Sequence, residues 1–191
     1  MRHTAQVRRT RLGVAGAVAA LTVAVLGACT GDAADPTTSP ATSASPSPTS
    51  AYVPVKPKFP AAAKKQTDAG AVAFAEYYLE TLDYAWSAPE GEVLKDLATT
   101  DCGLCTRLAR TASDYVSKGE RATGPVLSVQ NVLLVSTSAK YTLIACDVDL
   151  IPVTYLDKNG AVTYRESAKA LKWAVQLTWR DGWKVQALGE R

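Results

Sequence analysis

Helical spacing of apolar residues dominates the first half of the region 64–191. Thr67 or Asp68 can cap a helix, and the apolar positions that follow recur every three or four residues: Ala71, Val72, Ala75, Tyr78, Leu79, Leu82, Ala85 and Trp86. This spacing predicts a long amphipathic helix. Ser87-Ala88-Pro89-Glu90 has the form of a capping box with proline at the first helical position, and it predicts a short second helix through Leu97.

A third helix is predicted after Asp101, which can cap its start. Lys118-Gly119 is a good helix end. One side of this helix would carry Cys102, Cys105, Leu108, Ala112, Tyr115 and Val116.

After Gly124-Pro125 the spacing changes from helical to alternating, which is typical of strands. The segments with strand character are 127–135, a long run 141–155 interrupted or bulged at Pro152, and 171–179, which the turn Asp181-Gly182 joins to 183–187. Asp157 to Gly160 predicts a further turn. Helices followed by hairpin-linked strands predict an α+β domain over 64–191, with three N-terminal helices packed on one curved antiparallel sheet.

The first 63 residues have a different pattern. A basic segment, an apolar run from Leu12 to Leu26 and small residues form the three parts of a secretory signal over 1–28. Leu26-Gly27-Ala28-Cys29 resembles the lipobox of bacterial lipoproteins, which implies cleavage before Cys29 and acylation of its thiol. The alternative is an ordinary secretory signal with a chance cysteine. Residues 29–63 then read as a lipidated cysteine followed by a disordered Thr/Ser/Pro/Ala tether.

The charge balance narrows the range of partners. The chain has 21 basic and 18 acidic side chains, but Arg2, Arg8, Arg9 and Arg11 lie in the signal segment, so 17 basic residues remain in the mature protein. A nearly neutral protein lacks the basic surface that phosphate backbones require, which argues against nucleic acid as a partner. The only histidine is His3, so the mature protein has no imidazole and no histidine-dependent catalytic triad.

Cys102 and Cys105 form a C-x-x-C motif, for which there are three possible interpretations. A structural disulfide suits an oxidising compartment and is favoured. A redox dithiol would exploit a helix N-terminus, but no thioredoxin-like βαβ unit is evident. A zinc site would need four ligands, and Cys146 supplies only a third, so no metal site is predicted. Cys146 lies on the apolar side of its strand, where it is either a buried free thiol or a partner of one of the other two.

Several residues of the helical region also carry a resemblance to a known family. Ala73-Phe74, Tyr77-Tyr78, Leu82, Tyr84-Ala85, Leu94, Leu97 and the run Asp101-Cys102-Gly103-Leu104-Cys105 resemble a family of actinobacterial lipoproteins of unknown function. The resemblance implies membership in the superfamily of nuclear transport factor 2 and ketosteroid isomerase, whose fold is a cystatin-like cone. The chain departs from the family pattern at Asp83, where asparagine is usual, and around residues 87–91.

No residue-by-residue match transfers the catalytic carboxylates or tyrosine of the isomerases to this chain. Asp147 and Asp149 alternate along one strand and are expected on a solvated outer face. Tyr78, Trp86 and Trp173 are candidates to line an apolar pocket, although aromatic residues at such spacings are by default core.

The sequence therefore predicts a membrane-anchored lipoprotein on the extracytoplasmic face of the cell membrane, with no cofactor and no catalytic residues. Its domain would be a non-catalytic binding module. Its expected partners are the membrane, through the lipid anchor, and a small apolar ligand or an envelope protein. The alternatives are a small hydrolase or isomerase that uses carboxylates and tyrosines, and a C-x-x-C redox module.

Overall fold

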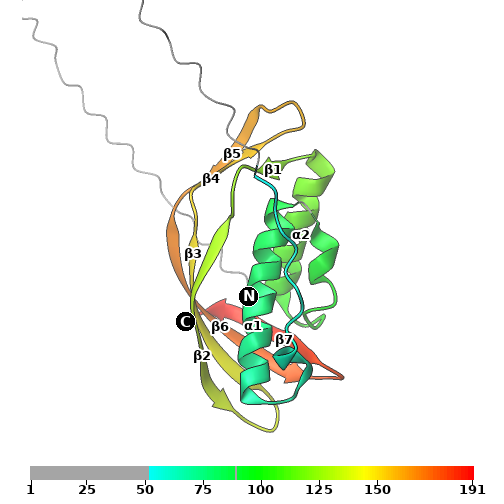
Figure 1. Cartoon of the computed structure of the whole chain (residues 1–191), viewed down its shortest axis with the longest axis vertical. Helices are drawn as coiled ribbons and strands as arrows, with labels where there is room; N and C mark the ends of the chain where they lie inside the picture. The colour runs from blue at the N-terminus through cyan, green and yellow to red at the C-terminus, as the bar shows by residue number, and fades with distance from the viewer. Residues whose placement is uncertain (1–51, 89) are drawn as a thin grey trace, which may run out of the picture. The chain divides into compact units, whose positions relative to one another are not determined.

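The computed structural model describes residues 52–88 and 90–191 (Figure 1). The predicted signal peptide, Cys29 and most of the predicted tether lie outside the described residues. Within the described part, no helix combines the length and hydrophobicity that crossing a membrane would require.

The long first helix is confirmed as α1, Asp68–Ser87. Thr67 is its N-cap, and the Thr67 side chain accepts a hydrogen bond from the Gly70 amide. A single 3₁₀ turn, η1 (Ala62–Lys64), precedes it. η1 packs closely against the start of α1: a Cβ added at Gly70 would lie 2.8 Å from the carbonyl oxygen of Ala62 and would clash with that of Lys65.

The predicted second helix is wrong. The chain forms only the 3₁₀ segment η2, Gly91–Leu94, followed by turns. Ser87, the predicted capping residue, is instead the last residue of α1, and its hydroxyl donates to the Asp83 carbonyl. The predicted third helix forms as α2, Gly103–Lys118, but its N-cap is Cys102 rather than Asp101. The described chain therefore has two α-helices where three were expected.

The predicted single sheet is also wrong: the described residues form two antiparallel sheets. The larger sheet has the order β2-β3-β6-β7, and the smaller has the order β1-β4-β5. The strand bounds are β1 Arg121–Ala122, β2 Leu127–Thr137, β3 Thr142–Leu150, β4 Val153–Leu156, β5 Val162–Glu166, β6 Lys169–Trp179 and β7 Trp183–Glu190.

Pro152 explains the division into two sheets. The predicted long strand ends at Leu150, and the chain resumes at Val153 in the other sheet, since proline cannot donate to a sheet ladder. β1 is too short to show alternation, and β5 is exposed along almost its whole length, so neither gave a hydrophobic pattern. The turns at 157–160 and 181–182 are confirmed.

The main core lies between α1 and the inner face of the larger sheet, which curves around the helix in Figure 1. Ile144, Cys146 and Val148 of β3 are buried on that face, as their alternation predicted. A second, smaller cluster lies under the smaller sheet and consists of Ala122, Val126, Val153 and Tyr155, with Trp86 and Tyr115 packed against it.

Candidate functional site

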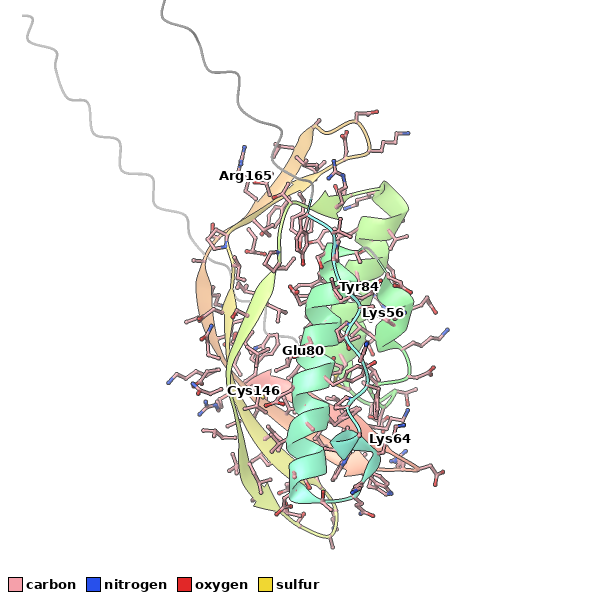
Figure 2. The ribbon with its side chains drawn as sticks, viewed as in Figure 1. Lys56, Lys64, Glu80, Tyr84, Cys146 and Arg165 are labelled. Atoms are coloured by element: carbon pink, nitrogen blue, oxygen red, sulfur yellow. A yellow bond between two sulfur atoms is a disulfide. The ribbon has the colours of Figure 1, made fainter. Side chains whose placement is uncertain are left out.

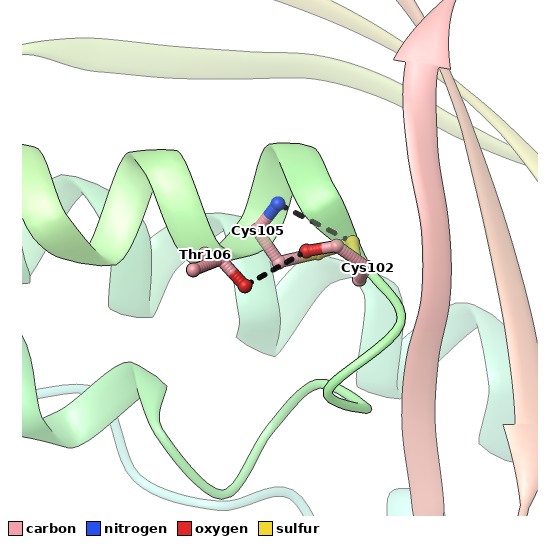
Figure 3. Close-up of a disulfide and its surroundings, with 3 residues drawn as sticks. All are labelled: Cys102, Cys105 and Thr106. Atoms are coloured by element: carbon pink, nitrogen blue, oxygen red, sulfur yellow. Dashed lines mark hydrogen bonds between the residues drawn. A yellow bond between two sulfur atoms is a disulfide. The ribbon is translucent and has the colours of Figure 1, made fainter.

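The C-x-x-C motif is a buried disulfide in the structure. Cys102 and Cys105 are bonded to each other at the start of α2, and they are 1% and 4% exposed. The Cys105 amide donates to Cys102 Sγ, and Thr106 Oγ1 donates to the Cys102 carbonyl (Figure 3). A redox dithiol must be reached by its substrate, so this burial favours the structural role.

Cys146 is a free thiol in the main core, fully buried on the inner face of β3. Burial raises its pKa to about 12. Because the thiolate is the reactive form, this cysteine behaves as a small hydrophobic residue.

The three aromatic residues predicted to line a pocket lie in or against the main core. Tyr78 and Trp173 are buried, and Trp86 is partly buried, with its indole N–H donating to the Leu108 carbonyl. None of the three lines the cavity described below. The Tyr78 hydroxyl has no hydrogen-bond partner among the described residues, and burial raises its pKa.

The aspartates of β3 lie on the outer face of the larger sheet. Asp147 pairs with Arg191 and accepts a hydrogen bond from the Asn131 side chain. Asp149 is likewise only partly buried. In the described part of the chain, no three His, Cys, Asp or Glu side chains gather in a way that would hold a metal ion.

A groove of about 520 Å³ lies beside β2, the first strand of the larger sheet. One wall is an extended segment before η1, residues 52–61, which we call the strap. The floor comes from Glu80 and Asp83 of α1, and the opposite wall is β2. The groove is lined by Val55, Lys56, Pro57, Lys58, Glu80, Asp83, Leu127 and Val129.

The strap lies within the region that the sequence assigned to the tether, yet it is held against α1. Phe59 packs edge-on against Tyr77, with ring centroids 4.9 Å apart. Lys56 pairs with Glu90 at 3.1 Å, and the Tyr84 hydroxyl donates to the same carboxylate. These two partners lower the pKa of Glu90. The folded part of the chain thus begins before residue 64.

The α1 floor of the groove is acidic. Glu76, Glu80 and Asp83 follow one another at intervals of four and three residues, so they share one side of the helix; we call them the acidic ridge. Burial raises the pKa of Glu80, and the nearby Glu76 carboxylate raises it further. In the described part of the chain, none of the three has a cation within 4.0 Å. Figure 2 shows Glu80 on the sheet-facing side of α1, with Tyr84 and Lys56 on the strap side.

Asp83 fixes the point where β2 begins. Its Oδ1 accepts hydrogen bonds from the amides of Val126 and Leu127, at 2.7 and 2.9 Å. Burial raises the pKa of Asp83, and the two amide bonds offset part of that rise. Because one oxygen is already engaged with backbone, the carboxylate has a clear structural role in joining α1 to the sheet.

Beyond Asp83, the outer edge of β2 is open. β2 is a terminal strand of the larger sheet, and no described backbone group outside β3 pairs with residues 128–137. Leu133, Leu134 and Val135 are 61%, 39% and 56% exposed, and the strand contains no charged residue and no proline. An open, uncharged edge strand is a template for pairing with another chain.

The residues of this groove were not among the candidates that the sequence predicted. In the sequence, Glu76, Glu80 and Asp83 lie opposite the apolar positions of the first helix, at helical spacing. Two facts had no sequence signal: that the strap folds back on α1, and that β2 is an edge strand. The departure from the family pattern at Asp83 was the one cue that pointed here.

Three comparisons place the chain among known proteins. No curated protein matches it significantly. The solved intermembrane space region of the chloroplast protein ARC6 is 13% identical, covers 66% of this chain and 97% of its own, and has a TM-score of 0.47. A putative calcium/calmodulin-dependent protein kinase II association domain from Xanthomonas campestris is 16% identical, covers 70% of this chain and 90% of its own, and has a TM-score of 0.40. Residues 36–187 match the model of a protein family whose description is "Family of unknown function (DUF6318)", and the chain belongs to this family.

Proposed function

We propose that this chain is a lipid-anchored extracytoplasmic protein whose domain is a non-catalytic binding module. The anchoring part rests on the sequence: the signal over 1–28, followed by Cys29 in a lipobox-like context. The chain is then an actinobacterial lipoprotein of the nuclear transport factor 2-like superfamily. Support for that placement comes from the family-like residues of α1 and from the curvature of the larger sheet around this helix.

The observation that carries the binding role is the groove beside the open edge of β2. A concave surface with an apolar wall and a few charged groups is the usual form of a recognition site. Here Leu127 and Val129 supply apolar contact, and the acidic ridge supplies charge without a local partner. The most enclosed carboxylate of the groove, Asp83, is engaged with backbone, which favours binding over acid–base chemistry.

The anchoring is tested by intact-mass analysis of the protein isolated from membranes. We expect a mature chain that begins at Cys29 and carries acyl chains, palmitate among them. Cys29→Ala should leave the leader uncut and remove the acyl mass. A native product that is cut elsewhere and bears no acyl chain would contradict the proposal.

The binding role is tested by photocrosslinking in intact cells. A benzoylphenylalanine at Val129, inside the groove, should yield adducts of discrete mass. The matched control places the same group at Lys118, which is exposed at the end of α2. We expect no discrete adduct there. Absence of adducts at 129, or equal adducts at both positions, would count against the groove as a binding site.

A further inference from the structure

We infer that the groove binds an extended peptide segment with a basic residue at every second position, which pairs with β2 as an added strand. This inference rests on the proposed binding function and names the class of partner. It joins three independent features of one surface: the open edge of β2, the acidic ridge of α1 and the proline-rich strap.

The edge of β2 offers the main-chain groups. Of the two edges of the larger sheet, this is the one that no other described strand or loop pairs with. Asp83 accepts from the amide of Leu127, so a carboxylate already satisfies the first open donor of this edge. A strand placed beyond it would satisfy the donors and acceptors that follow, from Val129 onward.

The strap cannot fill this position itself. Pro54, Pro57 and Pro60 occupy every third position along it and have no amide hydrogen, so they cannot continue a ladder. Ion pairing to Glu90 and packing of Phe59 hold the strap against α1 instead. The strap therefore bounds the groove without closing the edge of β2.

The negative charge of the acidic ridge favours a partner with basic side chains. In an added strand, every second side chain points to the same face of the sheet, here toward α1. These side chains would meet Glu76, Glu80 and Asp83, which lack cations within 4.0 Å in the described chain. On the strap side, Glu90 already neutralises Lys56, so Lys58 is the remaining positive charge. Lysine or arginine at alternate positions is the complementary pattern.

A second copy of this chain fits the edge less well. Its β2 is uncharged, so it would leave the acidic ridge unpaired. Pairing two β2 strands would also bring a second acidic ridge to the same edge, where like charges repel. The structure thus favours a basic segment over self-association.

The test measures binding of labelled ten-residue peptides to the purified full-length mature protein by fluorescence anisotropy. The probe alternates lysine with threonine. One control peptide replaces each lysine by glutamate, and another carries N-methyl groups on alternate residues, which block strand pairing but keep the charge. We expect saturable binding of the lysine peptide and at least tenfold weaker binding of both controls.

Variants of the protein separate the ridge from general charge. Glu76→Gln with Glu80→Gln should weaken binding of the lysine peptide at least tenfold. Glu92→Gln with Glu190→Gln removes the same charge from exposed sites outside the groove, and it should change affinity less than twofold. Equal binding of the N-methylated peptide, equal effects of the two double variants, or absence of saturable binding would each overturn the inference.

Self-association is a separate outcome. A dimer in sedimentation equilibrium that Leu133→Lys dissociates would show that a second copy occupies β2, and this would also overturn the inference. Failure of the peptide experiments with crosslinks still present at position 129 would leave the binding role intact and remove only the partner class. Peptide binding without crosslinks at 129 would instead count against the binding role in cells.

Discussion

The two edges of the larger sheet are treated in opposite ways. At β7 the chain covers its own edge: the Val185 amide donates to the Leu97 carbonyl, and the Thr99 amide donates to the Val185 carbonyl. Among the described residues, hydrogen bonds join α1 to β2 at the two ends of the strand: the Leu127 amide donates to Asp83, and the Thr137 hydroxyl donates to Asp68. A short loop therefore pairs with one edge of this sheet, whereas no described segment pairs with the outer edge of β2. The open edge is what distinguishes the β2 side of the sheet.

The closed edge depends on tight packing, and Trp183 is its most sensitive point. This residue begins β7, is 6% exposed, packs edge-on against Trp179 and donates its indole N–H to the Lys65 carbonyl. Trp183→Ala should lower the free energy of unfolding by about 3–5 kcal/mol, since a large buried ring is lost and a cavity remains. Urea denaturation monitored by circular dichroism measures this.

Trp183→Phe is the matched control for this prediction. It keeps an aromatic ring but loses the hydrogen bond to Lys65, so a smaller loss of about 1–2 kcal/mol is expected. A loss below 1 kcal/mol for Trp183→Ala would mean that β7 does not depend on this packing.

At the open edge, we expect the largest loss of stability from substitution of Asp83, which joins α1 to the start of β2. Asp83→Ala leaves the amides of Val126 and Leu127 without their acceptor, and we expect a loss of about 2–3 kcal/mol in the free energy of unfolding. Asp83→Asn keeps an oxygen acceptor and removes the charge, so its cost should be below about 1 kcal/mol. Equal losses for the two variants would contradict this account of the junction.

Asp83 also gives a pH dependence with a defined sign. Its pKa is raised in the folded protein, mainly by burial, so the folded state holds this proton more tightly than the unfolded state does. The contribution of Asp83 to stability therefore falls as pH rises from the unfolded pKa through the raised folded pKa, and it is constant above that. Compared with Asp83→Asn, the natural protein should lose stability over this interval in pH-resolved urea titrations. A relative gain would reverse the sign and contradict the prediction.

Residues 97–99, which pair with the edge of β7, lie just before Cys102 in the chain. Removing the disulfide therefore tests whether it stabilises this pairing. Changing Cys102 and Cys105 together to serine should cost about 2 kcal/mol, as expected for closing so short a loop. The Val185 amide should then exchange with deuterium faster than in the natural protein, since its acceptor is the Leu97 carbonyl. Unchanged exchange at Val185 would mean that the cover is independent of the disulfide. Cys146→Ser is not a suitable control, because that thiol lies in the core.

The contrast between the two edges also shows what the sequence could predict. Elements with strong periodicity were predicted correctly: α1, the inward face of β3 and the hairpin at Asp181-Gly182. The errors lie where the local pattern does not determine where an element ends or which sheet a strand joins. α1 continues through Ser87, which the local pattern assigned to the cap of a second helix, and the strand interrupted at Pro152 resumes in a second sheet. The break at Pro152 is visible in the sequence, but the sheet that a strand joins depends on distant segments, which a local pattern does not contain.

The candidate site could not be predicted from the sequence for the same reason. The helical spacing of the acidic ridge is visible in the sequence, but its role in a binding site depends on β2 lying beside it. Whether an alternating strand is central or at an edge depends on the order of strands in the sheet, which hydrophobic spacing does not encode. The proline-rich strap has the composition of a tether, and only its contacts with Tyr77 and Glu90 distinguish it from one.

The smallest effect is expected on the exposed part of the open edge. Leu133 is 61% exposed, and its replacement by lysine removes few contacts. Leu133→Lys should therefore change the free energy of unfolding by less than about 0.5 kcal/mol. The same change at Val185, which is fully buried on the closed edge, would bury an unpaired charge and should be strongly destabilising. Urea denaturation of the two variants side by side makes the comparison. A large loss for Leu133→Lys would show that this part of β2 is needed for folding, and the edge could then no longer be regarded as a surface kept open for a partner.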